Sequence, residues 1–210
     1  MTDTRSPYGT ALSWAAAACI GLVVTSTTPQ ENVRARALLG TSQWMTGDLV
    51  YRREPGWVST AAAAGNESGS PASHVGLIEK DESGLWVWHA AAPEGANLGG
   101  VRREPLHVFF ARSSLVQHQG TGMKLELHEV AAVVRYLNSV VGHRFDSKFD
   151  LTTPSEIYCT ELVLRTFASA GRQLAAMEAV FEIPISGRLQ VVTVEEIQRV
   201  ATELAPVTIH

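Results

Sequence analysis

The stretch HVGLIEKDESGLWVWHAA, residues 74 to 91, decides the fold, because two runs of β-branched and aromatic residues flank the polar turn DESG. This pattern predicts a β-hairpin. Both faces of the two strands carry apolar residues, so we expect the hairpin to lie in the middle of a sheet.

The hairpin is expected to bring two histidines onto one face of that sheet. A turn centred on Glu82 and Ser83 places His89 opposite Gly76 and diagonal to His74. Diagonal neighbours share a face and start about 7 to 8 Å apart, within reach of aromatic side chains. We therefore expect the two imidazoles to meet through one hydrogen bond, with Gly76 leaving room for the ring of His89. A turn one residue longer or shorter would put them on opposite faces.

Helices and strands alternate irregularly in the rest of the chain, which indicates an α+β fold. Besides the hairpin, the predicted strands are 47 to 53, 107 to 113 and a segment that ends before Thr193. The predicted helices are 31 to 40, 126 to 142, one that carries Cys159 and ends at Gly171, and one capped by Thr193 with Glu196. Residues 54 to 73 and 92 to 106 are predicted loops.

The composition is typical of one globular domain. The 210 residues are 45% hydrophobic and 18% charged, with a formal net charge of −4. A nucleic-acid partner requires a basic stripe that displaces counterions from phosphate, so this class of partner is not expected.

The N-terminal segment is typical of export. Residues 11 to 24, ALSWAAAACIGLVV, form an apolar run that is short for a membrane span and suits a signal-peptide core. We expect residues 1 to 28 to be a signal peptide or N-terminal anchor, and residues 29 to 210 to be a single domain. The chain is then periplasmic, extracellular or associated with a membrane through this segment; an alanine-rich helix of a cytoplasmic protein is the alternative. No disulfide is expected between Cys19 and Cys159, whose surroundings differ.

Cys159, His74 and His89 suit the three roles of a cysteine nucleophile, its base and a group that orients the base. Two starts are open for the cysteine helix. A capping box at Thr153 and Glu156 would place Cys159 in the second turn, whereas an extended EIY segment would make Cys159 open the helix, where the dipole lowers a thiol pKa. Taken singly, a cysteine with apolar neighbours is more often a buried core residue.

Six segments in order resemble one family of enzymes. They are TGDLVYRR (46 to 53), SHVGLIEKD (73 to 81), VWHAA (87 to 91), GVRREPLHVFFAR (100 to 112), HRFDSKF (143 to 149) and YCTELVLRTF (158 to 167). This series, which spans roughly residues 45 to 170, is similar to the YiiX-like cysteine hydrolases. They form a permuted branch of the NlpC-type papain-fold superfamily, related to the lecithin retinol acyltransferase-like proteins. The resemblance implies a small antiparallel sheet or barrel packed against the cysteine-bearing helix. It also implies Cys159 as nucleophile, His74 as base and His89 as the orienting residue.

The function implied is a papain-like cysteine hydrolase, an amidase or peptidase that forms a thioacyl-enzyme with a small peptide or amide, such as a cell-wall fragment. A lipid or ester acyl hydrolase or acyltransferase and a non-catalytic binding module are the alternatives. Asp48 and Tyr158 are candidates to shape the pocket, and Asp146 with Asp150 to meet a cationic substrate group, although packing and turn formation explain them equally well. No metal-ligand spacing such as H-E-x-x-H occurs, so no metal or other cofactor is expected. Neither the substrate nor the oligomeric state can be read from these motifs.

Overall fold

A five-stranded antiparallel sheet forms the centre of the protein. The computed structural model describes residues 44–54, 66, 69–111, 113, 116–121, 123–183 and 187–204. The strand order is β4-β3-β2-β1-β5, so the predicted hairpin, β2 and β3, lies inside the sheet as expected. The strands are β1 (Leu49–Arg52), β2 (His74–Asp81), β3 (Gly84–Ala91), β4 (Gly100–Pro105) and β5 (Val116–Gln119).

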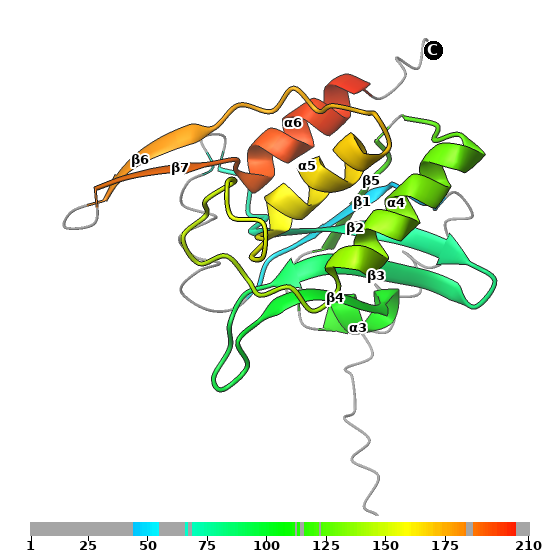
Figure 1. Ribbon diagram of the computed structural model, residues 1–210, viewed down its shortest axis with the longest axis horizontal. Coiled ribbons are helices and arrows are strands. Elements are labelled where there is room, and N and C mark those ends of the chain that lie inside the picture. Colours follow the sequence, from blue (N-terminus) through cyan, green and yellow to red (C-terminus); the bar gives the residue numbers. More distant parts are fainter. Residues whose placement is uncertain are drawn as a thin grey trace, which may run out of the picture.

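Helices cover both faces of the sheet (Figure 1). One face packs against α4 (Leu127–Val140), α5 (Cys159–Ser169) and α6 (Val194–Leu204), and the other against the short α3 (Leu106–Ala111). A separate two-stranded ribbon, β6 (Ala179–Ile183) and β7 (Gly187–Val191), projects beside α5 and α6 (Figure 1). The structure is thus a mixture of helices and antiparallel sheet, as the order of elements predicted.

The register of the central hairpin agrees with the prediction. Leu77 pairs with Trp88, and the ladder runs to Asp81 opposite Gly84. The Asp81 carboxylate closes the turn, because it accepts hydrogen bonds from the backbone N–H groups of Ser83 and Gly84 at 2.8 and 3.0 Å. This register fixes which side chains of β2 and β3 share a face.

One predicted strand is wrong, and a predicted loop contains a strand instead. Residues 107 to 113 were expected to be extended, but residues 106 to 111 form α3, which buries Leu106, Phe109 and Phe110. The strand at this point is β4, inside the segment 92 to 106 that the sequence indicated to be a loop. The aromatic run suggested a strand because of its composition, whereas here it packs one side of a helix against the sheet.

The other predicted elements that lie in the described residues are confirmed. The strand over 47 to 53 corresponds to β1 and the helix over 126 to 142 to α4, while α5 ends before Gly171, whose φ is +77°. The last helix is capped as expected, since the Glu196 N–H donates to the Thr193 hydroxyl at 3.1 Å. The predicted helix 31 to 40 and the apolar run 11 to 24 lie outside the described residues. None of the described helices is long and apolar enough to cross a membrane.

Gly76 should tolerate no side chain, because a Cβ atom there would lie 2.4 Å from Cγ1 of Val87 and 3.1 Å from the Trp88 carbonyl oxygen. We expect Gly76→Ala to lower the free energy of unfolding by about 1 to 3 kcal/mol, the usual cost of overpacking. Urea denaturation would measure it. Gly120→Ala is the matched control, since the nearest atom to its Cβ lies 3.7 Å away. Equal stability of the two variants would contradict the close packing at Gly76.

Candidate active site

The two histidines predicted to meet are hydrogen-bonded inside the sheet. Nε2 of His74 lies 2.8 Å from Nδ1 of His89, and the two rings are nearly perpendicular. Both residues are buried, and both rings lie against Phe109 of α3. A Cβ at Gly76 would lie 3.4 Å from Cβ of His89, so the glycine provides the expected space.

The histidine pair continues to a carboxylate that the sequence analysis missed. Nε2 of His89 lies 3.0 Å from Oε1 of Glu104, and the Arg102 Nε–H group lies 3.2 Å from the same nitrogen. Glu104 and Arg102 belong to β4, in which Arg102 pairs with His89. The segment GVRREP does not alternate apolar and polar residues and ends in proline, so no local pattern indicated that it forms a strand.

A buried arginine lies beside this chain of hydrogen bonds. Arg52, at the end of β1, is 1% exposed, and its guanidinium lies 4.0 Å from the centre of the Phe109 ring. It donates to the Phe109 carbonyl oxygen at 2.7 Å, contacts the Glu54 carboxylate, and lies 3.5 Å from Oε1 of Glu104. Oε1 of Glu54 in turn lies 3.8 Å from Nε2 of His74. Two carboxylates and an arginine therefore surround the imidazoles.

Both imidazoles are neutral near pH 7. Burial lowers the pKa of His74 to about 3, against the raising effect of Glu54. Burial also lowers the pKa of His89, against the hydrogen bond to Glu104. Although burial alone would raise the pKa of Glu54, attraction to His74, once that ring is protonated at low pH, and to Arg52 lowers it to about 2. The site thus holds ionised carboxylates next to uncharged imidazoles.

Cys159 is the first residue of α5, so the structure supports the extended EIY segment and not the capping box at Thr153. Tyr158, the N-cap, is extended, with φ −99° and ψ 171°. Its N–H donates to the Glu161 carboxylate at 3.2 Å. The hydroxyl of Thr160 donates to the Val192 carbonyl oxygen at 2.7 Å and so fixes the start of the helix against the segment before α6.

The cysteine is not the activated thiolate that its place on the helix suggested. It is 9% exposed and packs in the core on the α5 side of the sheet. Burial raises the pKa of Cys159 to about 12, although the backbone N–H of Val75 acts in the opposite direction. The cost of moving a thiolate out of water therefore exceeds the helix-terminal effect.

Cys159 lies beside the residue that follows His74, yet its sulfur is not hydrogen-bonded to a histidine. Within the described residues, no hydrogen bond joins Sγ of Cys159 to either imidazole. Nδ1 of His74 likewise has no hydrogen-bond partner in this part of the chain, since its bond to His89 uses Nε2. Among the described residues, the structure brings His74 and His89 together and leaves Nδ1 of His74 without a hydrogen-bond partner, while Sγ of Cys159 faces the backbone N–H of Val75.

The predicted pocket residues have their polar atoms engaged in other contacts. Asp146 is buried and accepts the N–H groups of Lys148 and Asp150 at 2.8 and 2.5 Å, while Asp150 accepts the N–H of Thr152 at 2.9 Å. Tyr158 is buried against Phe149 and accepts the Val192 N–H at 3.4 Å.

Asp48 accepts the Met45 N–H at 3.0 Å and lies beside Ile78, four residues along β2 from His74. These contacts are those of turn formation and packing. A role in substrate binding stays a prediction for Asp48, Tyr158 and Asp146.

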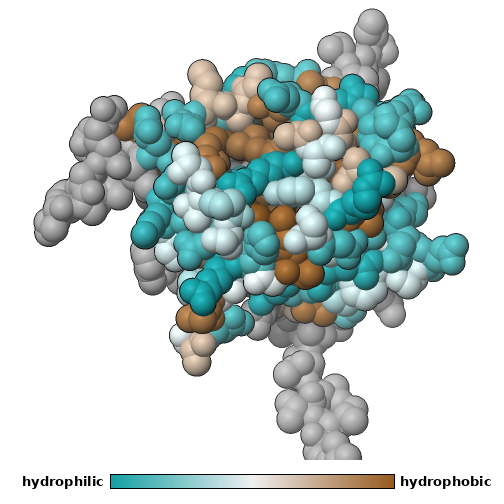
Figure 2. Space-filling view, viewed as in Figure 1, coloured by the Kyte–Doolittle hydropathy of each residue, from teal (hydrophilic) through white to brown (hydrophobic). Residues whose placement is uncertain are grey.

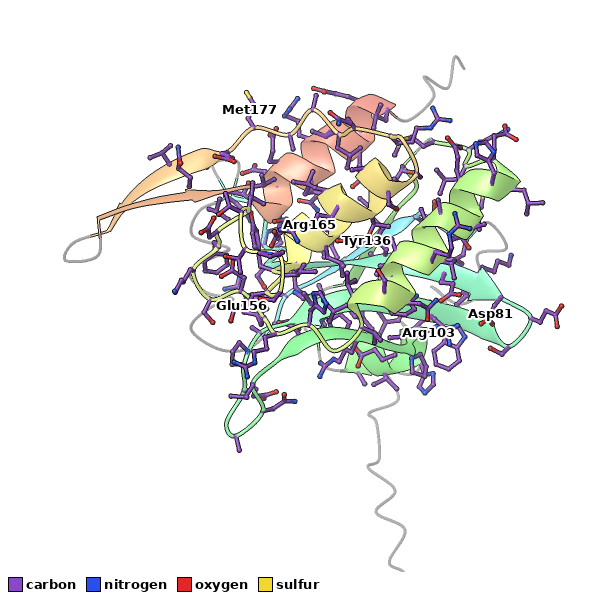
Figure 3. All side chains as sticks on the ribbon, viewed as in Figure 1. Asp81, Arg103, Tyr136, Glu156, Arg165 and Met177 are labelled. Carbon is purple, nitrogen blue, oxygen red and sulfur yellow. The ribbon has the colours of Figure 1, made fainter. Side chains whose placement is uncertain are left out.

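The loop that leads to Cys159 is tied to α5 by Arg165. Its guanidinium donates to the carbonyl oxygens of Leu151 and Thr153, each at 2.9 Å, and forms an ion pair with Glu161 at 2.5 Å. Figure 3 shows Arg165 on α5 close to Tyr136 of α4. These contacts fix the path of the chain into the N-terminus of α5.

One set of three residues could offer ligands to a metal ion. Among the described residues, Glu54, His74 and His89 have donor atoms within 4.8 Å of one another. Two nitrogens bound to one tetrahedral zinc ion lie about 3.3 Å apart, as follows from zinc–nitrogen distances of about 2.0 to 2.1 Å. The 2.8 Å between the imidazoles is instead a hydrogen bond, and Glu54 already binds Arg52. As arranged, this set does not fit a divalent ion.

Comparison with known proteins confirms the predicted resemblance at the level of the fold. The structure is similar to the crystal structure of metalloprotein yiiX from Escherichia coli O157:H7, with a TM-score of 0.62 and 17% sequence identity. The similarity covers 74% of this chain and 92% of that one. A scan against protein-family models gives no match, and a search of curated protein sequences gives no significant match.

Burial of His74 should make stability depend on pH. His74 takes up a proton near pH 6.5 in the unfolded chain and only near pH 3 in the folded one. Its contribution to the free energy of unfolding is therefore lost as the pH falls between these two values. From pH 7 to 5 this loss is about 2 kcal/mol, at 1.36 kcal/mol per pH unit. We expect the stability advantage of wild type over His74→Gln to shrink by this amount in urea denaturation. The comparison with the variant cancels Glu161, whose pKa burial raises to about 7. A pH-independent difference would contradict the neutral buried imidazole.

Burial of Cys159 should make its thiol slow to react. We expect iodoacetamide to alkylate Cys159 in the folded protein more slowly at pH 7 than in urea, with a rate that rises with pH beyond that of an ordinary thiol. Peptide mass spectrometry measures the rate at this residue. Fast alkylation of the folded protein at pH 7 would show that the thiol is activated at rest.

Proposed function

We propose that this protein is a cysteine hydrolase with a permuted papain-like, NlpC-type fold, which forms a thioacyl-enzyme on Cys159. The observation that carries the proposal is the position of Cys159. It opens α5 directly beside Val75. His74, the residue before Val75, is held through Nε2 by His89, and its Nδ1 has no hydrogen-bond partner among the described residues. Nucleophile and base on adjacent elements, with a third group on the base, are the parts that this chemistry needs.

The proposed reaction requires the Cys159 thiol, which packs on the α5 side, and the His74 ring, which lies against Phe109 of α3, to approach each other at the start of β2 when a substrate carbonyl binds. The thiol proton of Cys159 moves to Nδ1 of His74 as the sulfur bonds to the carbonyl carbon, and the carbonyl oxygen takes the negative charge. The backbone N–H of Cys159, at the N-terminus of α5, supports that oxyanion. The carbon–nitrogen bond then breaks, and the leaving amine takes the proton from His74. Water hydrolyses the thioester with His74 again acting as base.

The charges of the site suit general-base catalysis rather than a resting ion pair. Thiol and imidazole are both neutral at rest, and the missing hydrogen bond between them is no obstacle, because such contacts are often long until the substrate binds. When His74 accepts the proton, the ionised Glu54 lies 3.8 Å from its Nε2, and Glu104 lies beyond His89. These carboxylates stabilise the imidazolium, because the attraction between charges is stronger among buried groups than in water.

A small peptide or amide suits the surface better than a lipid. The exposed large hydrophobic residues of the described part of the chain come from separate segments, among them Met45, Leu98, Leu127 and Leu204. Figure 2 shows hydrophilic residues over most of the face that carries α4, α5 and α6, with smaller hydrophobic areas between them. A lipid substrate would favour a continuous apolar surface at the site.

A metal-dependent reaction is the other candidate, because the similar crystal structure is that of a metalloprotein. The donors Glu54, His74 and His89 do not fit an ion while the imidazoles are bonded to each other and Arg52 holds Glu54. No step of the proposed reaction uses a metal.

The experiment that tests the function is acylation by an activated ester, p-nitrophenyl acetate. We expect release of p-nitrophenol with transfer of one acetyl group to Cys159, detected by intact mass and peptide mapping. Cys159→Ala should abolish the adduct, and His74→Gln should slow its formation on the order of 100-fold, the size of a general-base contribution. EDTA should leave the rate unchanged.

Glu79→Gln serves as the folding control, since Glu79 is a buried carboxylate on the same strand that binds Trp88 and Arg103 instead. Acetylation of lysines alone, or an adduct on Cys159 that forms equally fast in His74→Gln, would sink the proposal.

A further inference from the structure

We propose that Glu104 is a positioning residue that sets the tautomer of His74 through His89, and that Arg102 favours the opposite tautomer. The consequence for catalysis rests on the proposed function, but the tautomer itself does not. The argument starts from His89, whose Nε2 faces an acceptor, Glu104, and a donor, Arg102, at 3.0 and 3.2 Å.

Glu104 selects one pattern of protons. An ionised carboxylate can only accept hydrogen bonds, so Nε2 of His89 must carry a proton to donate to Glu104. Nδ1 of His89 then has a lone pair and accepts the Nε2 proton of His74 across the 2.8 Å contact. In neutral His74 this leaves Nδ1 unprotonated. Nδ1 is the atom that must accept the thiol proton of Cys159.

Arg102 selects the reverse pattern. A guanidinium can only donate, so Nε2 of His89 must then be the acceptor and Nδ1 must carry the proton. That proton is donated to Nε2 of His74, and the proton of neutral His74 moves to Nδ1. In this pattern Nδ1 of His74 is a donor and the residue is not a base toward Cys159.

Three observations favour the pattern set by Glu104. Its Oε1 is buried and has no well-aligned hydrogen-bond donor in the described residues, so a proton on Nε2 of His89, 3.0 Å away, is the nearest one that could satisfy it, Arg52 being 3.5 Å away. Arg102 is 31% exposed at its side chain, so water can satisfy its guanidinium. Oε1 of Glu54 lies 3.8 Å from Nε2 of His74, where a proton is attracted and a lone pair is repelled.

The direct test is the ¹⁵N spectrum of histidine-labelled protein at pH 7, which distinguishes protonated from unprotonated ring nitrogens. In wild type we expect the proton of both His74 and His89 on Nε2. In Glu104→Ala we expect both protons on Nδ1, because Arg102 is then the remaining partner of His89. Removal of that partner as well, in Glu104→Ala/Arg102→Gln, should lower the population of the Nδ1 tautomers. Glu79→Ala is the matched control, since it removes a carboxylate bound to the arginine of β4 next to Arg102, and it should leave both tautomers unchanged.

Acylation of Cys159 by p-nitrophenyl acetate gives the second measurement. We expect Glu104→Ala to slow it by on the order of 100-fold, and the double variant to recover part of the loss. Two results would overturn the inference. One is a wild-type His74 with its proton on Nδ1, which needs no variant to be seen, and the other is a Glu104→Ala protein with unchanged tautomers. The predicted tautomers without any acylation of Cys159 would instead refute the proposed function and leave the role of Glu104 standing.

Discussion

The hydrogen bond between His74 and His89 joins two imidazole rings that are buried in the sheet. Most polar contacts around the rings exist because buried polar groups need partners. A buried imidazole has two nitrogens that need partners, and the two rings satisfy only one nitrogen each at their contact. The second nitrogen of His89 reaches Glu104. A buried carboxylate needs donors in turn, and Arg52 lies between Glu104 and Glu54. Gly76 makes the arrangement sterically feasible because it leaves space beside Cβ of His89.

The sequence predicted this histidine pair because the necessary information is local. The turn at Glu82 and Ser83 fixes the register of two adjacent strands, and a register fixes which side chains share a face. Glu104 was missed because it lies on a third strand, whose pairing depends on the path of residues 92 to 99 and has no local signal. The start of α5 was open for a similar reason. Whether residues before Cys159 are helical depends on contacts of Arg165 and Thr160 with distant backbone, which local capping preferences do not contain.

The state of the cysteine could not be predicted from its helix position, because two opposing effects meet there. Being the first helical residue lowers a thiol pKa, and burial raises it. Burial depends on how completely the sheet and the segment around Val192 cover the helix end, which is a property of the whole fold. The same reasoning explains α3. The residues of HVFFA (107 to 111) suit a strand by composition, yet they are helical because α3 covers the face of the sheet that carries the histidine pair.

The charges around Cys159 and His74 constrain how the proposed chemistry would proceed. The carboxylate of Glu54 raises the pKa of both groups: it disfavours a thiolate on Cys159 and favours an imidazolium on His74. Proton transfer at rest would therefore create a charged sulfur that this environment destabilises. Transfer coupled to attack avoids that cost, because the negative charge moves from the sulfur to the carbonyl oxygen of the substrate, at the N-terminus of α5. Glu54 stabilises the His74 imidazolium that forms, against the opposing effects of burial and Arg52. In the proposed reaction the proton would therefore move only when a carbonyl is present to take the charge, and the thiol would stay unreactive until substrate binds.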